Sequence, residues 1–311
     1  MTSFLTLASL TDFLAVTVRS ATPTLLTALG ILIMARSGLV NIGGEGLMLI
    51  GTLVGVAGSL YAGSAWAGLL AAAVAAGLAG LVFAYVTVTL RANQMVAGTA
   101  LNLLGLGLTS SLARILFGVN TAPPQIASFK SWAVPGLASL PVVGQAFFSQ
   151  MPPVYLAVLL VPLIHTLLYR TPAGLALRAV GEHPRAADAV GVDVFRVRYT
   201  ATVLGAMLAG AGGAYLSLGL LSFFGENMVA GRGFMALAAV IFGKYTPAGT
   251  LAATLLFGAG EALEFRLQAS GTAIPQEFLL MVPYVLTILA LAGFVGRSLP
   301  PAALGQPYAK E

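Results

Sequence analysis

The chain has 311 residues, of which 58% are hydrophobic and 8% are charged, whereas about a quarter of the residues in a typical soluble domain carry a charge. A water-soluble fold cannot bury so much apolar surface, so the composition predicts an integral membrane protein, and the absence of cysteine excludes disulfides, thiolate metal sites and a cysteine nucleophile. The formal net charge of +5 does not indicate nucleic acid binding, because five of the fifteen basic residues lie between positions 170 and 198, where apolar stretches flank them.

Uncharged stretches long enough to cross a bilayer recur along the chain. A transmembrane helix needs roughly 20 apolar residues to cross about 30 Å of hydrocarbon. The sequence predicts spans near residues 16–35, 44–62, 65–88, 95–116, 152–169, 199–222, 233–249, 250–265 and 278–296. The expected fold is an all-α polytopic membrane helix bundle of about eight to ten transmembrane helices, with broken or re-entrant elements where glycines interrupt a span. No linker marks a second domain, so residues 1–311 are expected to form a single transmembrane domain.

Residues 1–15 contain Asp12 among apolar residues. They fit either an interfacial helix or the beginning of the first span, and both interpretations stay open. The residues here do not show the pattern of a removable signal peptide, which has a basic start, a short apolar core and a small-residue cleavage site. We therefore expect the first helices to remain in the membrane.

The orientation follows from the basic residues of the 170–198 loop, because positive residues are retained on the cytoplasmic side. Counting spans from that loop puts the proline-containing segment 117–152 outside. It puts Arg36, Arg91 and Lys244 inside, and leaves the N-terminus outside.

Glycines and two polar side chains interrupt an apolar run at Gly38–Met48. Non-helical backbone at membrane depth persists only beside protein or water, so the segment predicts a break between helices. Asn41 and Glu45 are four residues apart, which would let both face one cavity. A carboxylate at membrane depth is a functional candidate, but Glu45 equally fits a residue that caps helix ends through hydrogen bonds.

The segment from Arg170 to Val192 is small, cationic and partly apolar. Pro184 suits the first position of a helix and Gly191 suits its end, so Arg185–Val190 is expected to form a short helix. Two short amphipathic pieces would then meet at Gly181. Such a loop fits docking into a groove of another protein as well as an ordinary positive-inside loop.

Charged residues also occur near the predicted outer ends of the late spans. Glu261 and Glu264 share one helical face with Arg266 nearby, which favours an ion pair over a proton path. Arg232 and Glu226 are expected to be interfacial anchors.

Four ordered segments combine small and polar residues at distinctive spacing. They are Asn41-Ile42-Gly43-Gly44-Glu45-Gly46, Ala97-Gly98-Thr99-Ala100-Leu101-Asn102, Arg178-Ala179-Val180-Gly181-Glu182-His183-Pro184-Arg185-Ala186-Ala187 with Gly191-Val192, and Gly231-Arg232-Gly233-Phe234-Met235-Ala236-Leu237-Ala238-Ala239-Val240-Ile241-Phe242-Gly243-Lys244. Together they resemble the permease subunits of ABC importers in the simple-sugar and nucleoside branch. The resemblance runs from about residue 20 to residue 297, which is nearly the whole chain.

The resemblance implies roles for individual residues. The 170–198 loop would seat on an ATPase subunit, and the residues implied in coupling are Arg178, Gly181, Glu182, Pro184, Arg185, Ala186 and Gly191. A nucleoside presents hydroxyls, ring nitrogens and an aromatic face, so amides and aromatic rings suit its pathway. The pathway candidates are Asn41, Glu45, Asn102, Phe223 and Asn227. The phenylalanine ring fits an interfacial belt or packing better than it fits a substrate contact.

The resemblance is greatest to nucleoside permeases, with a simple-sugar permease as the alternative. An ion-coupled secondary transporter with Glu45 as the coupling residue is a further alternative, but it leaves the 170–198 loop without a role. A membrane enzyme is not favoured, because no nucleophile–base pair, paired carboxylates or metal cluster stands out.

A permease of this family works within an assembly. The chain lacks the Gly-x4-Gly-Lys-Ser/Thr motif of phosphate-binding loops, so ATP would be used by a separate ABC ATPase subunit and this chain would bind no cofactor and no metal. The resemblance also implies a second, nonidentical permease subunit and an extracytoplasmic substrate-binding protein that docks near 117–152. The implied location is the cytoplasmic (inner) membrane of a bacterium, with several passes through the bilayer and no nucleic acid partner.

Overall fold

The computed structural model describes residues 7–118, 124–138, 140, 142–270, 278, 281, 285 and 298–310. The helices are α1 (Leu7–Arg36), α2 (Gly44–Ala62), α3 (Ala65–Ala84), α4 (Gln94–Phe117), α5 (Val143–Phe148), α6 (Pro152–Arg170), α7 (Pro172–Glu182), α8 (Pro184–Ala189), α9 (Val194–Tyr215), α10 (Arg232–Phe242) and α11 (Pro247–Ala269). Two π-helical turns, η2 (Tyr85–Thr89) and η3 (Leu216–Leu220), extend α3 and α9. Strands β1 (Trp132–Ala133) and β2 (Ser149–Gln150) pair antiparallel. The all-α prediction is confirmed.

Six helices in the described part of the chain are long and apolar enough to cross a membrane. They are α1, α2, α3 with η2, α4, α6 and α9 with η3. These helices match the first six predicted spans. The predicted span 250–265 lies within the 23-residue α11, which carries Glu261, Glu264 and Arg266. The predicted span 278–296 falls outside the described residues, apart from positions 278, 281 and 285.

Helix α10 is shorter than the span predicted at 233–249. It has 11 residues and ends at Phe242, so at 1.5 Å per residue it is about 16 Å long, roughly half of the hydrocarbon thickness. The chain turns at Lys244 and Tyr245, which both have a φ of 54°. Pro247 then starts α11, because proline suits the first turn of a helix, where its missing N–H is not needed.

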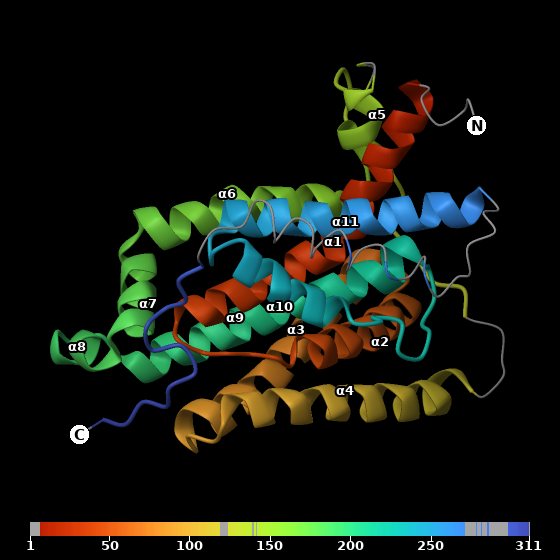
Figure 1. Cartoon of the computed structure of the whole chain (residues 1–311). Coiled ribbons are helices and arrows are strands. Elements are labelled where there is room, and N and C mark those ends of the chain that lie inside the picture. Colours follow the sequence, from red (N-terminus) through yellow and green to blue (C-terminus); the bar gives the residue numbers. More distant parts are fainter. Residues whose placement is uncertain are drawn as a thin grey trace.

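Helix α1 lies at the centre of the bundle. Its 30 residues begin at Leu7 without a break before the first predicted span, so the described part of 1–15 begins that span. Helices α6, α9, α10 and α11 surround α1 (Figure 1). A Cβ atom built on Gly30 of α1 would lie 2.2 Å from the carbonyl oxygen of Gly205 in α9. The two backbones are therefore in direct contact, which small residues at a helix interface permit.

The two ends of the molecule differ. Helices α7 and α8 and residues 298–310 lie at one end, whereas α5 and the first turns of α1 lie at the other (Figure 1). At the first end, Nε of Arg36 donates to the carbonyl oxygen of Tyr245 at 2.8 Å. At the other end, Nε of Arg19 donates to Oε1 of Gln150 at 2.7 Å. The segments predicted to lie on opposite sides of the membrane thus occupy opposite ends.

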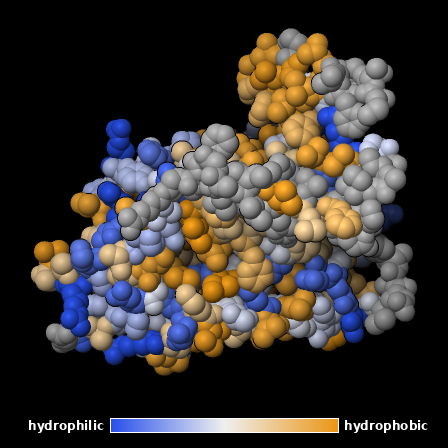
Figure 2. Space-filling view, in the orientation of Figure 1, coloured by the Kyte–Doolittle hydropathy of each residue, from blue (hydrophilic) through white to orange (hydrophobic). Residues whose placement is uncertain are grey.

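The hydropathy of the surface follows this arrangement. On the face in Figure 2, hydrophilic residues gather at the end that holds α7 and α8. Large hydrophobic side chains are exposed along α3 and α4, among them Leu78, Val82, Leu103 and Ile115. Exposed side chains of this kind suit contact with lipid or with another membrane subunit.

Candidate functional site

The carboxylate of Glu45 joins two helix beginnings. Glu45 lies in the first turn of α2, and its two oxygens accept the backbone N–H groups of Gly231 and Gly233, each at 2.8 Å. Gly231 is the residue before α10, and Gly233 lies in its first turn. The unsatisfied N–H groups and the positive end of the helix dipole both favour a carboxylate there. The side chain of Glu45 thus bonds the start of α10 to the start of α2.

The backbones of α2 and α10 meet at this point. A Cβ atom on Gly233 would lie 2.2 Å from the backbone nitrogen of Glu45, a distance that no side chain can tolerate. Gly231 has a φ of 86°, in the left-handed region that glycine adopts most readily. Glycine at both positions therefore permits the contact that the carboxylate completes.

Asn102 of α4 holds the other side of the same break. Its Oδ1 accepts the N–H of Gly46 at 2.8 Å, and its Nδ2 donates to the carbonyl oxygen of Ile42 at 3.1 Å. Asn41 folds the segment locally, because its Oδ1 accepts the N–H of Gly43 at 2.7 Å. The break between α1 and α2 is thus fixed by side-chain amides, which satisfy backbone groups that a helix would otherwise pair.

The structure brings together three of the five predicted pathway residues. Asn41 is fully buried and Glu45 is 7% exposed. The hydrogen bonds of Glu45 and Asn102 are with backbone groups of this chain, and Asn41 bonds a backbone N–H and the sulfur of Met34, which favours the helix-end interpretation of Glu45. A substrate contact by any of the three stays a prediction.

Phe223 and Asn227 lie on residues 221–231, which connect η3 to α10. Both are exposed, and Asn227 has a φ of 55°. Met228 and Val229 of the same connection pack against Met48 and Leu49 of α2, so the connection follows α2. The structure therefore places Phe223 and Asn227 on an exposed connection, and not with Asn41 and Asn102 at the break before α2.

An ion pair ties this connection to α4. Nε of Arg114 donates to Oε1 of Glu226 at 2.9 Å, and both side chains are about half exposed. The hydrogen bond from the Arg114 guanidinium lowers the pKa of the Glu226 carboxyl below its ordinary value.

Helices α7 and α8 form the predicted coupling region. Pro184 is the first residue of α8, and Gly191, with a φ of 88°, follows its end, so the short helix predicted from these two residues is confirmed. The hydroxyl of Thr171 accepts the N–H of Gly174 and caps α7. Arg185 and Ala186 of α8 are exposed.

Two other coupling candidates, Arg178 and Gly181, face the body of the protein. A Cβ atom on Gly181 would lie 2.2 Å from the carbonyl oxygen of Arg36, at the end of α1. The guanidinium of Arg178 lies 5.1 Å from the centre of the Tyr169 ring, in a cation–π arrangement. Gly181 therefore sets how closely α7 approaches α1.

Comparison with known proteins decides the class of this chain. Residues 13–291 match the family model for the branched-chain amino acid transport system permease component. The chain belongs to this permease family. It is 40% identical to the guanosine ABC transporter permease protein NupQ of Bacillus subtilis, over 93% of this chain and 94% of the relative. No solved structure matches the chain.

Two further relatives carry different substrate names. The chain is 38% identical to the nucleoside ABC transporter permease protein NupC of Lactococcus lactis, over 93% of this chain and 94% of the relative. It is 36% identical to the putative glucose ABC transporter permease protein TsgC13 of Haloferax volcanii, over 95% and 96% of the two chains. The permease is thus a multi-pass membrane transport subunit and not an enzyme, as predicted.

The charged residues near the other end of the permease pair differently from the prediction. Glu261 pairs with Arg232 of α10 at 3.3 Å between Oε2 and Nη2, and the two side chains are 8% and 16% exposed. Arg232 thus pairs with a residue of another helix, and its position at the membrane interface stays a prediction. The local sequence could not reveal this pair, because Glu261 and Arg232 belong to different helices. The prediction instead named Arg266, which is nearer to Glu261 in the sequence.

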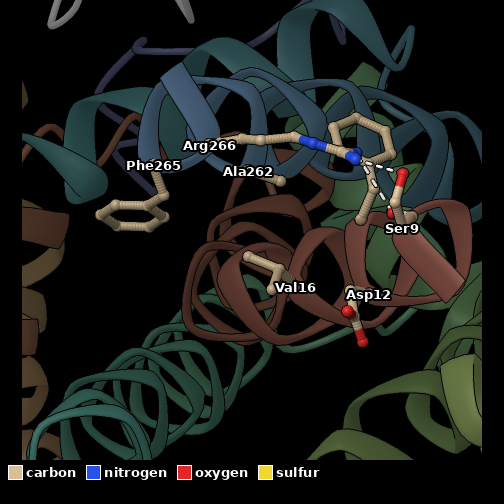
Figure 3. Close-up of a pocket in the computed structure, with 7 residues that line it drawn as sticks. Ser9, Asp12, Val16, Ala262, Phe265 and Arg266 are labelled. Carbon is tan, nitrogen blue, oxygen red and sulfur yellow. Dashed lines mark hydrogen bonds between the residues drawn. The ribbon is translucent and has the colours of Figure 1, made fainter. Parts of the chain in front are cut away.

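Arg266 borders a separate hollow between α1 and α11. Figure 3 shows its guanidinium directed toward Ser9, to which it donates, whereas Asp12 points away. The hollow has a volume of about 310 Å³ and an apolar wall that includes Val16 and Phe265. Within the described residues, no three His, Asp or Glu side chains are grouped so that they could hold a metal ion.

Sequence reasoning missed one residue of the coupling region. Arg198 was counted only as a basic loop residue, but it is 1% exposed at the base of α9. No local signal marks its burial, because a basic residue directly before an uncharged stretch is typical of an interfacial anchor.

Proposed function

We propose that this permease is the membrane-spanning subunit of an ABC importer that carries nucleosides. The observation that carries the proposal is similarity over almost the whole chain to permeases named for guanosine and nucleoside transport. The exposed helix α8 at the end of the molecule supports it, because a short helix there suits docking to an ATPase.

We also propose the rest of the assembly. A separate ABC ATPase subunit would bind α7 and α8 and use ATP, while this chain would bind no cofactor. A second, nonidentical permease and an extracytoplasmic binding protein would complete the importer in the bacterial cytoplasmic membrane. The segment around α5, which exposes Trp132, Val143 and Phe147 beside the N-terminal end of α1, offers a surface for the binding protein.

The packing suggests how ATPase movement would reach the pathway. Closure of the ATPase subunits would displace α7, whose Gly181 contacts the carbonyl group of Arg36 at the end of α1. The residues after Arg36 lead into the break that Asn102 and Glu45 hold. Displacement of one end would therefore be passed to the junction of α2 and α10 and rock the two sides of the bundle.

A specific observation weakens the ion-coupled alternative. Both carboxylate oxygens of Glu45 already accept backbone N–H groups, so the residue is committed to fixed donors. A coupling carboxylate must instead exchange its ion during each cycle.

The test is transport by the assembled importer in membrane vesicles. This chain would be co-expressed with the ATPase, second permease and binding protein encoded beside it, and uptake of labelled guanosine and glucose measured with and without ATP. An assembly with an inactive ATPase is the matched control. ATP-dependent guanosine uptake supports the proposal, ATP-dependent uptake of glucose alone changes the substrate, and uptake by this chain alone with an ion gradient overturns it.

A further inference from the structure

Residues 298–310, here named the strap, cross the end of the molecule that holds the coupling region. The N–H of Ala303 donates to the carbonyl oxygen of Gly181 at 2.9 Å, and the N–H of Gly305 donates to the carbonyl oxygen of Gly38 at 3.0 Å. The strap therefore bonds both the end of α7 and the beginning of the break that leads to α2.

A side chain of the strap packs beneath α8. Tyr308 is 7% exposed and shares a buried cluster with Val180 of α7, Ala187 of α8 and Val194 of α9. Its ring also meets the ring of Phe195 edge to face, with 5.8 Å between their centres. Tyr308 thus contributes to the contact of three helices.

Polar contacts fix the strap on either side of Tyr308. Nη1 of Arg198 donates to the carbonyl oxygen of Gln306 at 3.1 Å, so the strap supplies an acceptor for a buried guanidinium. Nζ of Lys310 lies 3.3 Å from Oδ1 of Asp188 in α8. In addition, Oε2 of Glu182 accepts the N–H of Ala302 at 3.0 Å.

Helix α8 depends on such contacts for its position. It has six residues, far fewer than the roughly 12 to 15 that an isolated helix needs to be even marginally stable. Of its residues, Ala187 is the buried one, and it lies in the cluster that contains Tyr308. The orientation of α8 is therefore set by what lies beneath it.

We propose that the strap is a positioning element of the coupling region: Tyr308 holds α8 in the orientation from which it engages the ATPase. This inference rests on the proposed function for its role in transport, whereas the positioning itself depends only on this chain. The strap also links α8 mechanically to the break before α2, through Gly181 and Gly38. Movement of α8 would then be shared by α7, the strap and the break.

The first test uses this chain alone, reconstituted in lipid nanodiscs. Because the natural chain contains no cysteine, a spin label can be attached at Val190→Cys, directly after α8, where the side chain is 80% exposed. Tyr61→Cys, 76% exposed in the last turn of α2, is the control label. The motion of each label is compared between the parent and Tyr308→Ala, Tyr308→Leu and Tyr308→Phe variants.

We expect Tyr308→Ala to increase label motion at position 190 and not at position 61, whereas Tyr308→Phe keeps the ring and the parent spectrum. If Tyr308→Ala alters both labels, the milder Tyr308→Leu decides: a change at 190 alone supports the proposal. Unchanged motion at 190 in Tyr308→Ala, or changes at both positions in both variants, overturns it.

The second test uses the assembled importer. Nucleoside uptake per ATP hydrolysed is expected to fall about threefold or more in Tyr308→Ala and to recover in Tyr308→Phe. Leu299→Ala, a strap variant whose side chain is 72% exposed, is the control and should match the parent. An unchanged ratio in Tyr308→Ala overturns the strap's role in coupling, whereas an inactive parent assembly counts against the proposed function and leaves the label test to decide positioning.

Discussion

Oε2 of Glu45 accepts a 2.8 Å hydrogen bond from the backbone N–H of Gly233 and so joins α2 to α10. The two residues are 188 positions apart in the sequence. The neighbouring bond to Gly231 uses the other carboxylate oxygen. The junction of these helices therefore depends on one carboxyl side chain.

Replacing Glu45 tests this junction. Glu45→Gln keeps the size of the side chain but turns one acceptor into a donor, which would face a buried N–H. We expect a loss of about 1–3 kcal/mol of stability, measured as a lower Tm of the purified permease in detergent. Asp12→Asn, which alters an exposed carboxylate, is the control. A normal Tm together with abolished uptake would instead assign Glu45 to substrate.

Replacing Gly181 tests the contact between α7 and α1. In Gly181→Ala the added methyl group meets the Arg36 carbonyl oxygen and forces α7 outward. We expect a loss of about 1–3 kcal/mol in stability and ATP hydrolysis that no longer drives uptake. Gly107→Ala is the matched control, because Gly107 is also helical and has nothing within 4 Å of an added Cβ. Equal behaviour of the two variants would refute the contact's importance.

The buried ion pair of Arg232 and Glu261 predicts a strong double-mutant effect. Removing one partner alone, as in Glu261→Leu or Arg232→Met, leaves the other charge buried, and we expect a loss of about 3–5 kcal/mol. The combined Arg232→Met and Glu261→Leu variant should regain most of that stability. Thermal unfolding of the purified variants measures it, and additive losses in the double variant would contradict the pairing.

The exposed pair of Arg114 and Glu226 predicts a pH effect of known sign. The folded-state pKa of Glu226 is lowered from 4.5, so the pair stabilises the fold above that pH, and its contribution is lost as the pH falls through the lowered value. The difference in Tm between the parent and Glu226→Gln is therefore expected to shrink on acidification. If the Tm difference stays constant from neutral pH to well below 4.5, the ionised form of Glu226 does not stabilise the fold through this pair.

Local signals predicted the elements that depend on local chemistry. Pro184 and Gly191 were sufficient to locate α8, because proline and glycine fix helix ends through their own backbone preferences. Hydropathy located six spans, because the apolar character of a span is also a property of consecutive residues. The span predicted at 233–249 ran past the end of α10 at Phe242 into the first residues of α11, because hydropathy does not resolve the turn at Lys244 and Tyr245.

Contacts between distant residues were beyond such signals. The residues bonded to Glu45 lie 186 and 188 positions away, and no periodicity in the sequence relates them. Likewise, nothing in residues 298–310 marks Tyr308 as buried, because its neighbours in the cluster come from three other helices. The motif residues were identified correctly as a group, but their hydrogen-bond partners required the fold.

The central position of α1 has a consequence for how the chain is made. Helix α1 is synthesised first, yet α9, whose backbone touches it at Gly30 and Gly205, follows about 160 residues later. At about 5–20 residues per second, α1 waits about 8–30 s in the membrane before its main neighbour exists. During that interval its threonine-rich surface, including Thr22 and Thr27, faces lipid or the insertion machinery. Biogenesis of this bundle thus requires that its core helix tolerate exposure long before it is enclosed.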